Sequence, residues 1–190
     1  GEDRDSTLAG GSYHLTSAEK KLIECVEGEF KKTVIVLGIG SPMDLGWTKE
    51  LPPSALLIVW AGGMESGNAI ADVLTGAREP GGRLTDALMS SYSASPVSSA
   101  VDTMKVCEYS EDIYVGYRYF ETFAKDKVLF PFGAGMGYTT FSYSDAAVRS
   151  EGGKVTVTVR VTNTGDREGR DVVELYISAP GKALPRPARE

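Results

Sequence analysis

Two kinds of hydrophobic periodicity divide the chain into an α/β part and a β part. In the first part, runs that are apolar at almost every position alternate with stretches whose apolar residues recur every third or fourth position. The runs at 33–38 and 55–60 are typical of parallel strands covered on both faces, and the stretches at 16–30 and 65–74 are typical of helices. This alternation predicts an α/β layer with a mostly parallel sheet.

Local signals mark the ends of the two predicted helices. Thr16 and Glu19 have the spacing of a capping box, in which each residue's side chain binds the other's backbone N–H group. Gly76 follows the second helix, where a residue in the left-handed conformation commonly ends a helix. A further short helix is expected over residues 45–49.

Beyond residue 77 the pattern becomes irregular. Residues 79–82 (EPGG) predict a turn, and the serine-rich residues 90–99 predict a loop. Residues 113–120 are rich in aromatic side chains and predict a strand. We interpret its aromatic side chains as sheet packing, with a platform for stacking sugars as the alternative: Tyr114, Tyr117, Tyr119 and Phe120.

The last third of the chain has the strict alternation of a strand with one buried face. This pattern covers residues 155–161, a turn is predicted at 163–166, and residues 172–177 predict the next strand. A β-sandwich needs about seven strands and about 100 residues. We therefore expect only the first strands of a β-sandwich, truncated at residue 190.

Composition excludes several classes of partner. The formal net charge is −6 and the basic residues are scattered, whereas proteins that bind nucleic acid usually carry a basic patch. No run reaches the roughly 18 apolar residues that a membrane span requires. Neither nucleic acid nor a membrane is therefore expected as a partner.

The residues that commonly hold metals are scarce. Cys25, Cys107 and the single histidine, His14, lack the spacing of a zinc site, a disulfide framework or a catalytic triad. We expect both cysteines to be small core residues and His14 to have a local or surface role. The glycines at 38–40 and 62–67 follow predicted strands but lack the rest of a nucleotide-binding motif, so no cofactor and no metal are expected.

Five segments, in order along the chain, resemble segments of glycoside hydrolase family 3, the family that contains the β-glucosidases. Residues 63–76 (GMESGNAIADVLTG) resemble the motif GQEGGNAIADVLFG, and residues 79–84 (EPGGRL) resemble NPSGRLP. Residues 130–141 (FPFGAGMGYTTF) resemble FPFGYGLSYTTF. Residues 109–122 resemble the segment that precedes the final domain, and residues 161–177 resemble the start of a fibronectin type III-like domain. The resemblance covers nearly the whole chain.

The resemblance implies an architecture. Members of this family combine a barrel, an α/β sandwich and often a fibronectin-like domain, with the active site between the barrel and the sandwich. The chain shows no barrel sequence. It is therefore expected to comprise a partial α/β sandwich at 1–136, truncated at its start, and the truncated start of a fibronectin type III-like domain at 137–190.

The resemblance also implies a retaining mechanism through a glycosyl-enzyme intermediate. The aspartate nucleophile would come from the barrel domain of the same enzyme, and in many members the sandwich supplies the glutamate acid/base. The implied substrate is an oligosaccharide or aryl β-glycoside with terminal β-linked glucose. An isolated segment without the nucleophile is expected to be inactive.

The acid/base glutamate of many members is the first glutamate of a loop reading SGEGxDR, for which two registers fit the start of this chain. The preferred register aligns Asp3 and Arg4 with the DR of the motif and places the catalytic glutamate just upstream of Gly1. The alternative register makes Glu2 the acid/base and requires a two-residue deletion. In either register, Asp3 and Arg4 could pair to hold the catalytic loop.

Three further alternatives stay open. Glu65 could face the substrate cleft, although a carboxylate near a helix amino terminus is also stabilised by the free N–H groups there, and we prefer that structural role. Departures from the motifs, such as Met64 for glutamine and Met136-Gly137 for Leu-Ser, leave a β-xylosidase or an N-acetylglucosaminidase possible. A non-catalytic carbohydrate-associated module is the alternative outside the enzymes.

Overall fold

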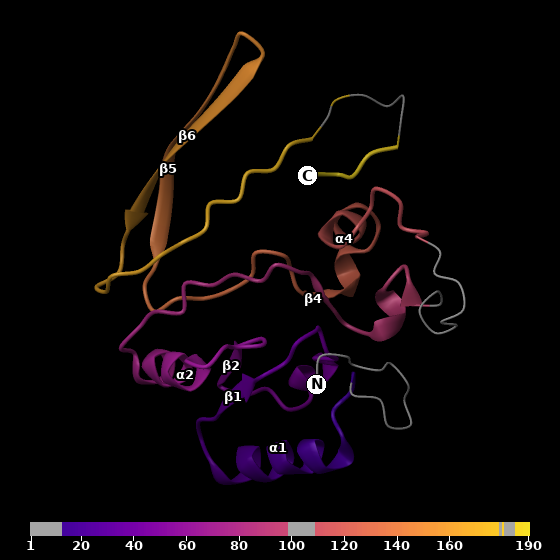
Figure 1. Ribbon diagram of the computed structural model, residues 1–190, viewed down its shortest axis with the longest axis vertical. Helices are drawn as coiled ribbons and strands as arrows, with labels where there is room; N and C mark the ends of the chain where they lie inside the picture. The colour runs from indigo at the N-terminus through magenta and orange to yellow at the C-terminus, as the bar shows by residue number, and fades with distance from the viewer. Residues whose placement is uncertain (1–12, 99–108, 179, 181–184) are drawn as a thin grey trace.

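Figure 1 shows the computed structural model, which describes residues 13–98, 109–178, 180 and 185–190. The helices and strands are α1 (Ser17–Glu29), β1 (Val34–Leu37), η1 (Gly46–Lys49), β2 (Ala55–Ile58), α2 (Ser66–Thr75), β3 (Leu88–Met89), η2 (Tyr92–Ala94), α4 (Tyr117–Phe123), η3 (Lys125–Lys127), β4 (Val128–Phe130), β5 (Phe141–Glu151) and β6 (Lys154–Asn163), where η denotes a 3-10 helix.

We call residues 13–136 the α/β part and residues 137–190 the C-terminal segment. In the α/β part, β1 and β2 pair in parallel, and α1 and α2 lie beside this pair (Figure 1). The capping box of Thr16 and Glu19 starts α1, and Gly76, with φ 76°, ends α2, so both helix predictions are confirmed. Strands β3 and β4 form a separate antiparallel pair.

The chain thus has a mixed α/β fold in its first part, and its parallel pairing is confirmed for one pair of strands. Of the sheets in the described residues, β1–β2 is parallel, whereas β3–β4 and β5–β6 are antiparallel, and each has two strands. The complete sandwich with a mostly parallel sheet, and the boundary between domains at residue 136, stay predictions.

The hydrophobic core lies beyond the carboxyl end of β1. It is built around a cluster of buried side chains, namely Ile39, Met43, Leu45, Trp47 and Leu88. Ile35 and Leu37 of β1 pack against this cluster, whereas Val34 and Val36, which alternate with them, are 53% and 37% exposed. The prediction that β1 is covered on both faces is therefore wrong for the described residues, because only one of its faces meets the core.

The prediction that Cys25 is a core residue is also wrong. Cys25 is exposed on α1, as are Leu22 of the same helix and Phe30 just after it, whereas Ile23 of α1 packs against the core. A helix that contacts one layer buries only one stripe of its surface. The described residues provide no second layer over α1 that would bury Cys25. Cys107 lies outside the described residues.

The aromatic run at 113–120 does not form the predicted strand. Residues 117–123 form helix α4, which begins after Gly116, a residue with φ 59°. Phe120 is buried, and the Tyr117 ring lies 4.6 Å from the Phe132 ring. Aromatic residues favour strands because they pack well on a sheet, and here a helix instead brings Tyr117 against Phe132, two residues beyond the end of β4.

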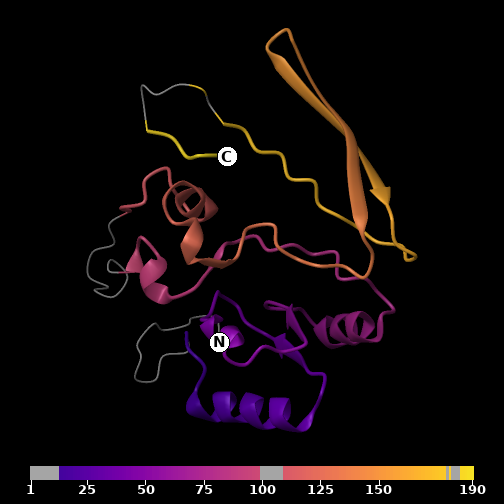
Figure 2. The same cartoon turned by 180° about the vertical axis from the view of Figure 1, so that it is seen from behind.

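The C-terminal segment contains the long hairpin β5–β6, which extends away from the rest of the molecule (Figure 2). Its strands are joined through Gly152 and Gly153, both with positive φ, as tight hairpin turns require. The predicted strand at 155–161 is confirmed as part of β6, but the buried face predicted for it is wrong for the described residues, because Val155, Val157 and Val161 are exposed. Strand β5 was not predicted, because its side chains are mostly polar and exposed and a bulge interrupts its pairing after Ser144.

The second predicted strand of this segment, at 172–177, is wrong for the described residues. The chain runs extended there without joining a sheet, although Ile177 exchanges two backbone hydrogen bonds with Glu190. A strand is stabilised by its neighbours, and no described strand lies in register beside this stretch. The β5–β6 hairpin is compatible with the start of a fibronectin-like domain, which stays a prediction.

No helix among the described residues is long and apolar enough to cross a membrane. Within the same residues, no group of three or more His, Cys, Asp or Glu side chains is placed to hold a metal ion.

Candidate functional site

The residues predicted to carry the chemistry, Glu2, Asp3 and Arg4, lie outside the described residues. The described structure begins at Tyr13, where the segment that contains them joins the fold. The described residues nearest to them in the chain are Tyr13 and His14, which attach this segment to the fold.

The attachment point is a cluster of polar bonds centred on Asp44. The Asp44 N–H group donates to the Tyr13 carbonyl at 2.8 Å, and the His14 Nδ1 atom lies 2.9 Å from Asp44 Oδ2. The Gly46 N–H group donates to Asp44 Oδ1 at 2.7 Å. These bonds fix Tyr13 and His14 to the loop that follows β1. His14, expected to have a local or surface role, is half-buried and held by this carboxylate.

The Tyr13 side chain reinforces this attachment. It is 4% exposed, and its ring meets the Tyr92 ring edge to face at a centroid distance of 5.3 Å. Burial, together with the negative charge of Asp44 and the neighbouring Tyr92, raises the pKa of the Tyr13 phenol to about 12. Tyr13 is therefore neutral at physiological pH and serves as a packed anchor rather than as an acid or base.

Two hydrogen-bond donors of the same region are unused among the described residues. The Ser41 hydroxyl and the Trp47 indole N–H group are both buried without a partner there. Both follow the carboxyl end of β1, and ligands of open α/β sheets usually bind beyond the carboxyl ends of the strands. Together with the Asp44 cluster, they place several polar groups at this end of the core.

Glu65 lies at the amino end of α2, as the structural interpretation of this residue expects. It occupies the N-cap position, but its carboxylate does not bind a backbone N–H group of the first turn. Instead Glu65 Oε2 accepts a hydrogen bond of 2.6 Å from the Asn68 side chain. Glu65 is exposed, and neither its structural role nor its alternative role in the cleft is decided by this contact.

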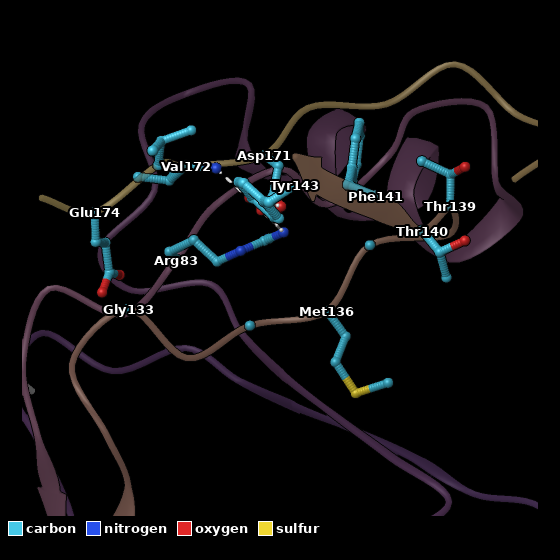
Figure 3. Close-up of a pocket in the computed structure, with 13 residues that line it drawn as sticks. Arg83, Gly133, Met136, Thr139, Thr140, Phe141, Tyr143, Asp171, Val172 and Glu174 are labelled. Atoms are coloured by element: carbon cyan, nitrogen blue, oxygen red, sulfur yellow. Dashed lines mark hydrogen bonds and ion pairs between the residues drawn. The ribbon is translucent and has the colours of Figure 1, made fainter. Parts of the chain in front are cut away.

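A shallow groove of about 660 Å³ lies between the α/β part and the C-terminal segment (Figure 3). Arg83 and Asp171 point toward one another in this groove, and Arg83 Nη2 lies 2.8 Å from Asp171 Oδ1. The Tyr143 hydroxyl donates a short hydrogen bond to the other carboxylate oxygen of Asp171. The two side chains of the ion pair are only 13% and 17% exposed.

These contacts determine how the groups of the groove ionise. The hydrogen bond from Tyr143, with further help from the Val172 N–H group and Arg83, lowers the pKa of Asp171. The same bond raises the pKa of the Tyr143 phenol. Because both oxygens of Asp171 are occupied, it serves as a fixed anion that joins two parts of the chain rather than as a free acid or base.

A second ionic contact joins the carboxyl terminus to α4. Arg189 Nε donates to Glu121 Oε2 at 2.9 Å, and Lys125 Nζ lies 2.9 Å from the same oxygen. Burial raises the pKa of Glu121, but the hydrogen bonds from Arg189 and Lys125 outweigh it, so the pKa is lowered overall. The guanidinium group of Arg189 also lies 4.9 Å from the centre of the Tyr176 ring.

Sequence reasoning missed the partners in these clusters. Asp44 is 30 residues from His14, and Asp171 is 88 residues from Arg83, so no local spacing connects them. Arg83 does lie in the segment EPGGRL, which the motif comparison singled out. That match marked the arginine without revealing its partner.

Comparison with known proteins places the chain among enzymes much longer than itself. The family described as "Glycosyl hydrolase family 3 C-terminal domain" matches residues 1–138. A β-glucosidase of Ruminococcus albus is 41% identical over 189 residues, which cover 100% of this chain and 20% of that protein. β-Glucosidase A of Butyrivibrio fibrisolvens is 38% identical over 198 residues, which cover 94% and 24% respectively.

A solved structure agrees with these sequence matches. The structure of β-glucosidase 3B from Thermotoga neapolitana in complex with glucose superposes with a TM-score of 0.90 at 38% identity, covering 99% of this chain and 27% of that one. The chain therefore spans about a fifth to a quarter of the length of these relatives.

Proposed function

The chain belongs to glycoside hydrolase family 3, and from this premise we propose that it forms part of a retaining, exo-acting β-glucosidase that hydrolyses terminal β-linked glucose. The observation that carries this proposal is the match of the whole chain, at 41% identity, to the β-glucosidase of Ruminococcus albus. The proposed substrates are short oligosaccharides and aryl β-glucosides.

In this proposal the chain supplies the acid/base side of the cleft, and the barrel domain of the same enzyme supplies the aspartate nucleophile. The acid/base is Glu2, or a glutamate just upstream of Gly1 in the preferred register. It protonates the glycosidic oxygen as the leaving group departs and then activates the water that hydrolyses the intermediate. Asp3 and Arg4 hold the catalytic loop.

The Asp44 cluster supports this arrangement physically. It fixes Tyr13 and His14, 11 and 12 residues beyond Glu2, to the loop that follows β1. An acid/base works only when it is held within hydrogen-bonding distance of the glycosidic oxygen. Fixed positions of Tyr13 and His14 give the segment that carries Glu2 a defined point of attachment to the fold.

The experiment is a chimera in which this chain replaces the matching segment of the Ruminococcus albus enzyme, so that a barrel is present. Hydrolysis of aryl β-glucosides, β-xylosides and N-acetyl-β-glucosaminides is measured for the chimera and for the chain alone. We expect turnover of the glucoside by the chimera and none by the chain alone. Glu2→Gln in the chimera distinguishes the two registers, and Glu24→Gln is the matched control at an exposed glutamate of α1.

Each outcome has a distinct meaning. A loss of about a hundredfold or more in kcat on Glu2→Gln, without loss on Glu24→Gln, identifies Glu2 as the acid/base. Unchanged activity on Glu2→Gln supports the register in which the glutamate lies upstream. A folded chimera that prefers the xyloside or the glucosaminide contradicts the proposed sugar, and turnover by the chain alone contradicts the placement of the nucleophile on the barrel.

A further inference from the structure

A single carboxylate lies between the two parts of the chain and binds the backbone of the C-terminal segment at two points. The Tyr138 N–H group donates to Glu79 Oε1, and the Arg170 N–H group donates to Glu79 Oε2, both at 3.1 Å. Glu79 belongs to the turn that follows α2, whereas the two donors precede β5 and follow β6. The carboxylate thus holds both ends of the hairpin at once.

Two glycines make room for this carboxylate. A Cβ atom at Gly137 would lie 2.1 Å from Glu79 Oε1, and a Cβ atom at Gly169 would lie 2.0 Å from Glu79 Oε2. Neither glycine has a positive φ, so the backbone conformation at these positions does not itself require glycine. A side chain at position 137 would displace the flexible Glu79 carboxylate, and one at position 169 would also meet the Thr139 methyl group, 2.4 Å from its Cβ atom.

A further bond ties the same place to α2. The Tyr138 hydroxyl donates to the Val73 carbonyl at 2.7 Å. Val73 lies in the last turn of α2, and its carbonyl group also accepts a hydrogen bond of 3.0 Å from the N–H group of Gly76, which ends the helix. Tyr138 therefore binds the end of α2 through its side chain and Glu79 through its backbone.

We infer that the Glu79 carboxylate, which lies between Gly137 and Gly169, fixes the orientation of the β5–β6 hairpin relative to α2. We call its two hydrogen bonds, from the N–H groups of Tyr138 and Arg170, the Glu79 clasp. The clasp does not depend on the activity proposed for the enzyme, since it consists of contacts within this chain. It also makes Glu79 and Gly137 interdependent. A side chain at position 137 expels the carboxylate and breaks both hydrogen bonds, which is the same loss that shortening Glu79 causes.

The chain differs from the family motifs at both of these positions. Where this chain has Glu79, the motif NPSGRLP has asparagine, and where it has Gly137, the motif FPFGYGLSYTTF has serine. An asparagine side chain is one methylene group shorter and ends near the position of Glu79 Cδ, which lies 3.1 Å from a Cβ atom at residue 137. Glutamate in place of asparagine at position 79, and glycine in place of serine at position 137, therefore both affect the same contact.

The experiment is a cycle of Glu79→Asn, Gly137→Ser and the double variant, with amide hydrogen exchange of Tyr138 and Arg170 followed by NMR. We expect each single substitution to speed exchange of both amides about tenfold or more, because a hydrogen bond to a charged acceptor is lost. The double variant should exchange no faster than the single variants, because the same contact is removed. Gly63→Ser is the matched control, since nothing lies within 4 Å of a Cβ atom there.

A check of folding and a second variant at position 79 complete the experiment. The tryptophans, Trp47 and Trp60, are both in the α/β part, so their fluorescence reports whether a variant has folded. Should Gly137→Ser fail to fold, Glu79→Gln keeps the test: it retains the length but only one acceptor oxygen, so one of the two amides should be released. Effects that multiply in the double variant, or amides that exchange at the original rate in Glu79→Asn and Glu79→Gln, would overturn the inference.

Discussion

Replacing Asp171 by asparagine should weaken the junction between the α/β part and the C-terminal segment. The carboxylate accepts hydrogen bonds from Arg83 and Tyr143, and its side chain is only 17% exposed. Asparagine keeps the shape of the side chain but removes the charge and one acceptor. Arg83 would then lose its ionic partner while staying largely buried.

The expected magnitude follows from that burial. A hydrogen bond to a charged group contributes about 1.5–3 kcal/mol when it is shielded from solvent, so Asp171→Asn should lower the free energy of unfolding by about 2 kcal/mol. The matched control is Asp145→Asn, which removes the ion pair with Arg160, whose side chains are 64% and 69% exposed. The control should cost less than about 1 kcal/mol. Asp145 has φ 55°, a conformation that asparagine adopts as readily as aspartate.

The assay is urea unfolding followed by far-UV circular dichroism, repeated from pH 7 down to pH 2. The pKa of Asp171 is lowered in the folded protein, first by Tyr143 and also by Arg83, so its contribution is present above the ordinary carboxyl pKa of about 3.9. That contribution is lost as the pH falls through the lowered folded value. The difference between the original protein and Asp171→Asn should therefore be constant near neutrality and shrink below about pH 4.

Two results would refute this reasoning. One is a cost for Asp171→Asn no larger than that of Asp145→Asn, which would mean that the groove does not shield the pair. The other is a difference that persists unchanged to pH 2, which would mean that the carboxylate charge is not what stabilises the junction.

Two other predictions concern the core and the exposed apolar surface. Leu45 is 1% exposed, so Leu45→Ala should lower the free energy of unfolding by about 3 kcal/mol. Leu22→Ala, at a side chain that is 63% exposed, should lower it by less than about 1 kcal/mol. Urea unfolding followed by tryptophan fluorescence measures both values, and equal values would contradict the position of the core. The isolated chain should also self-associate as its concentration rises, because β6 and residues 172–177 expose apolar side chains. Sedimentation velocity measures this, and a monomer at every concentration would count against it.

The sequence predicted those parts of the fold that local chemistry decides. The capping box of Thr16 and Glu19, and Gly76 at the end of α2, involve residues close together in the chain, so their patterns could be recognised directly. The alternation at 155–161 was equally clear. The resemblance to glycoside hydrolase family 3, which the comparisons confirm, also rested on short continuous segments such as residues 63–76 and 130–141.

What the sequence did not predict depends on contacts between distant residues. The aromatic run forms helix α4, in which the Tyr117 ring packs against the Phe132 ring. Strand propensity, which reflects local sequence, does not include this contact with a residue 15 positions away. The exposure of Cys25 and Val34 depends on which layers surround a strand or helix, and a periodic pattern shows only that a face is apolar. Among the site residues, Asp44 and Asp171 could not be paired with His14 and Arg83 without the fold.

The hairpin turn at Gly152 and Gly153 has a practical consequence. The turn lies at the far tip of β5–β6, and no other atom lies within 4 Å of a Cβ built at either glycine. Exposed tips of this kind accept insertions most readily. A dye or short affinity tag placed there would report how the hairpin moves against the rest of the chain and would disturb neither the core nor the junction.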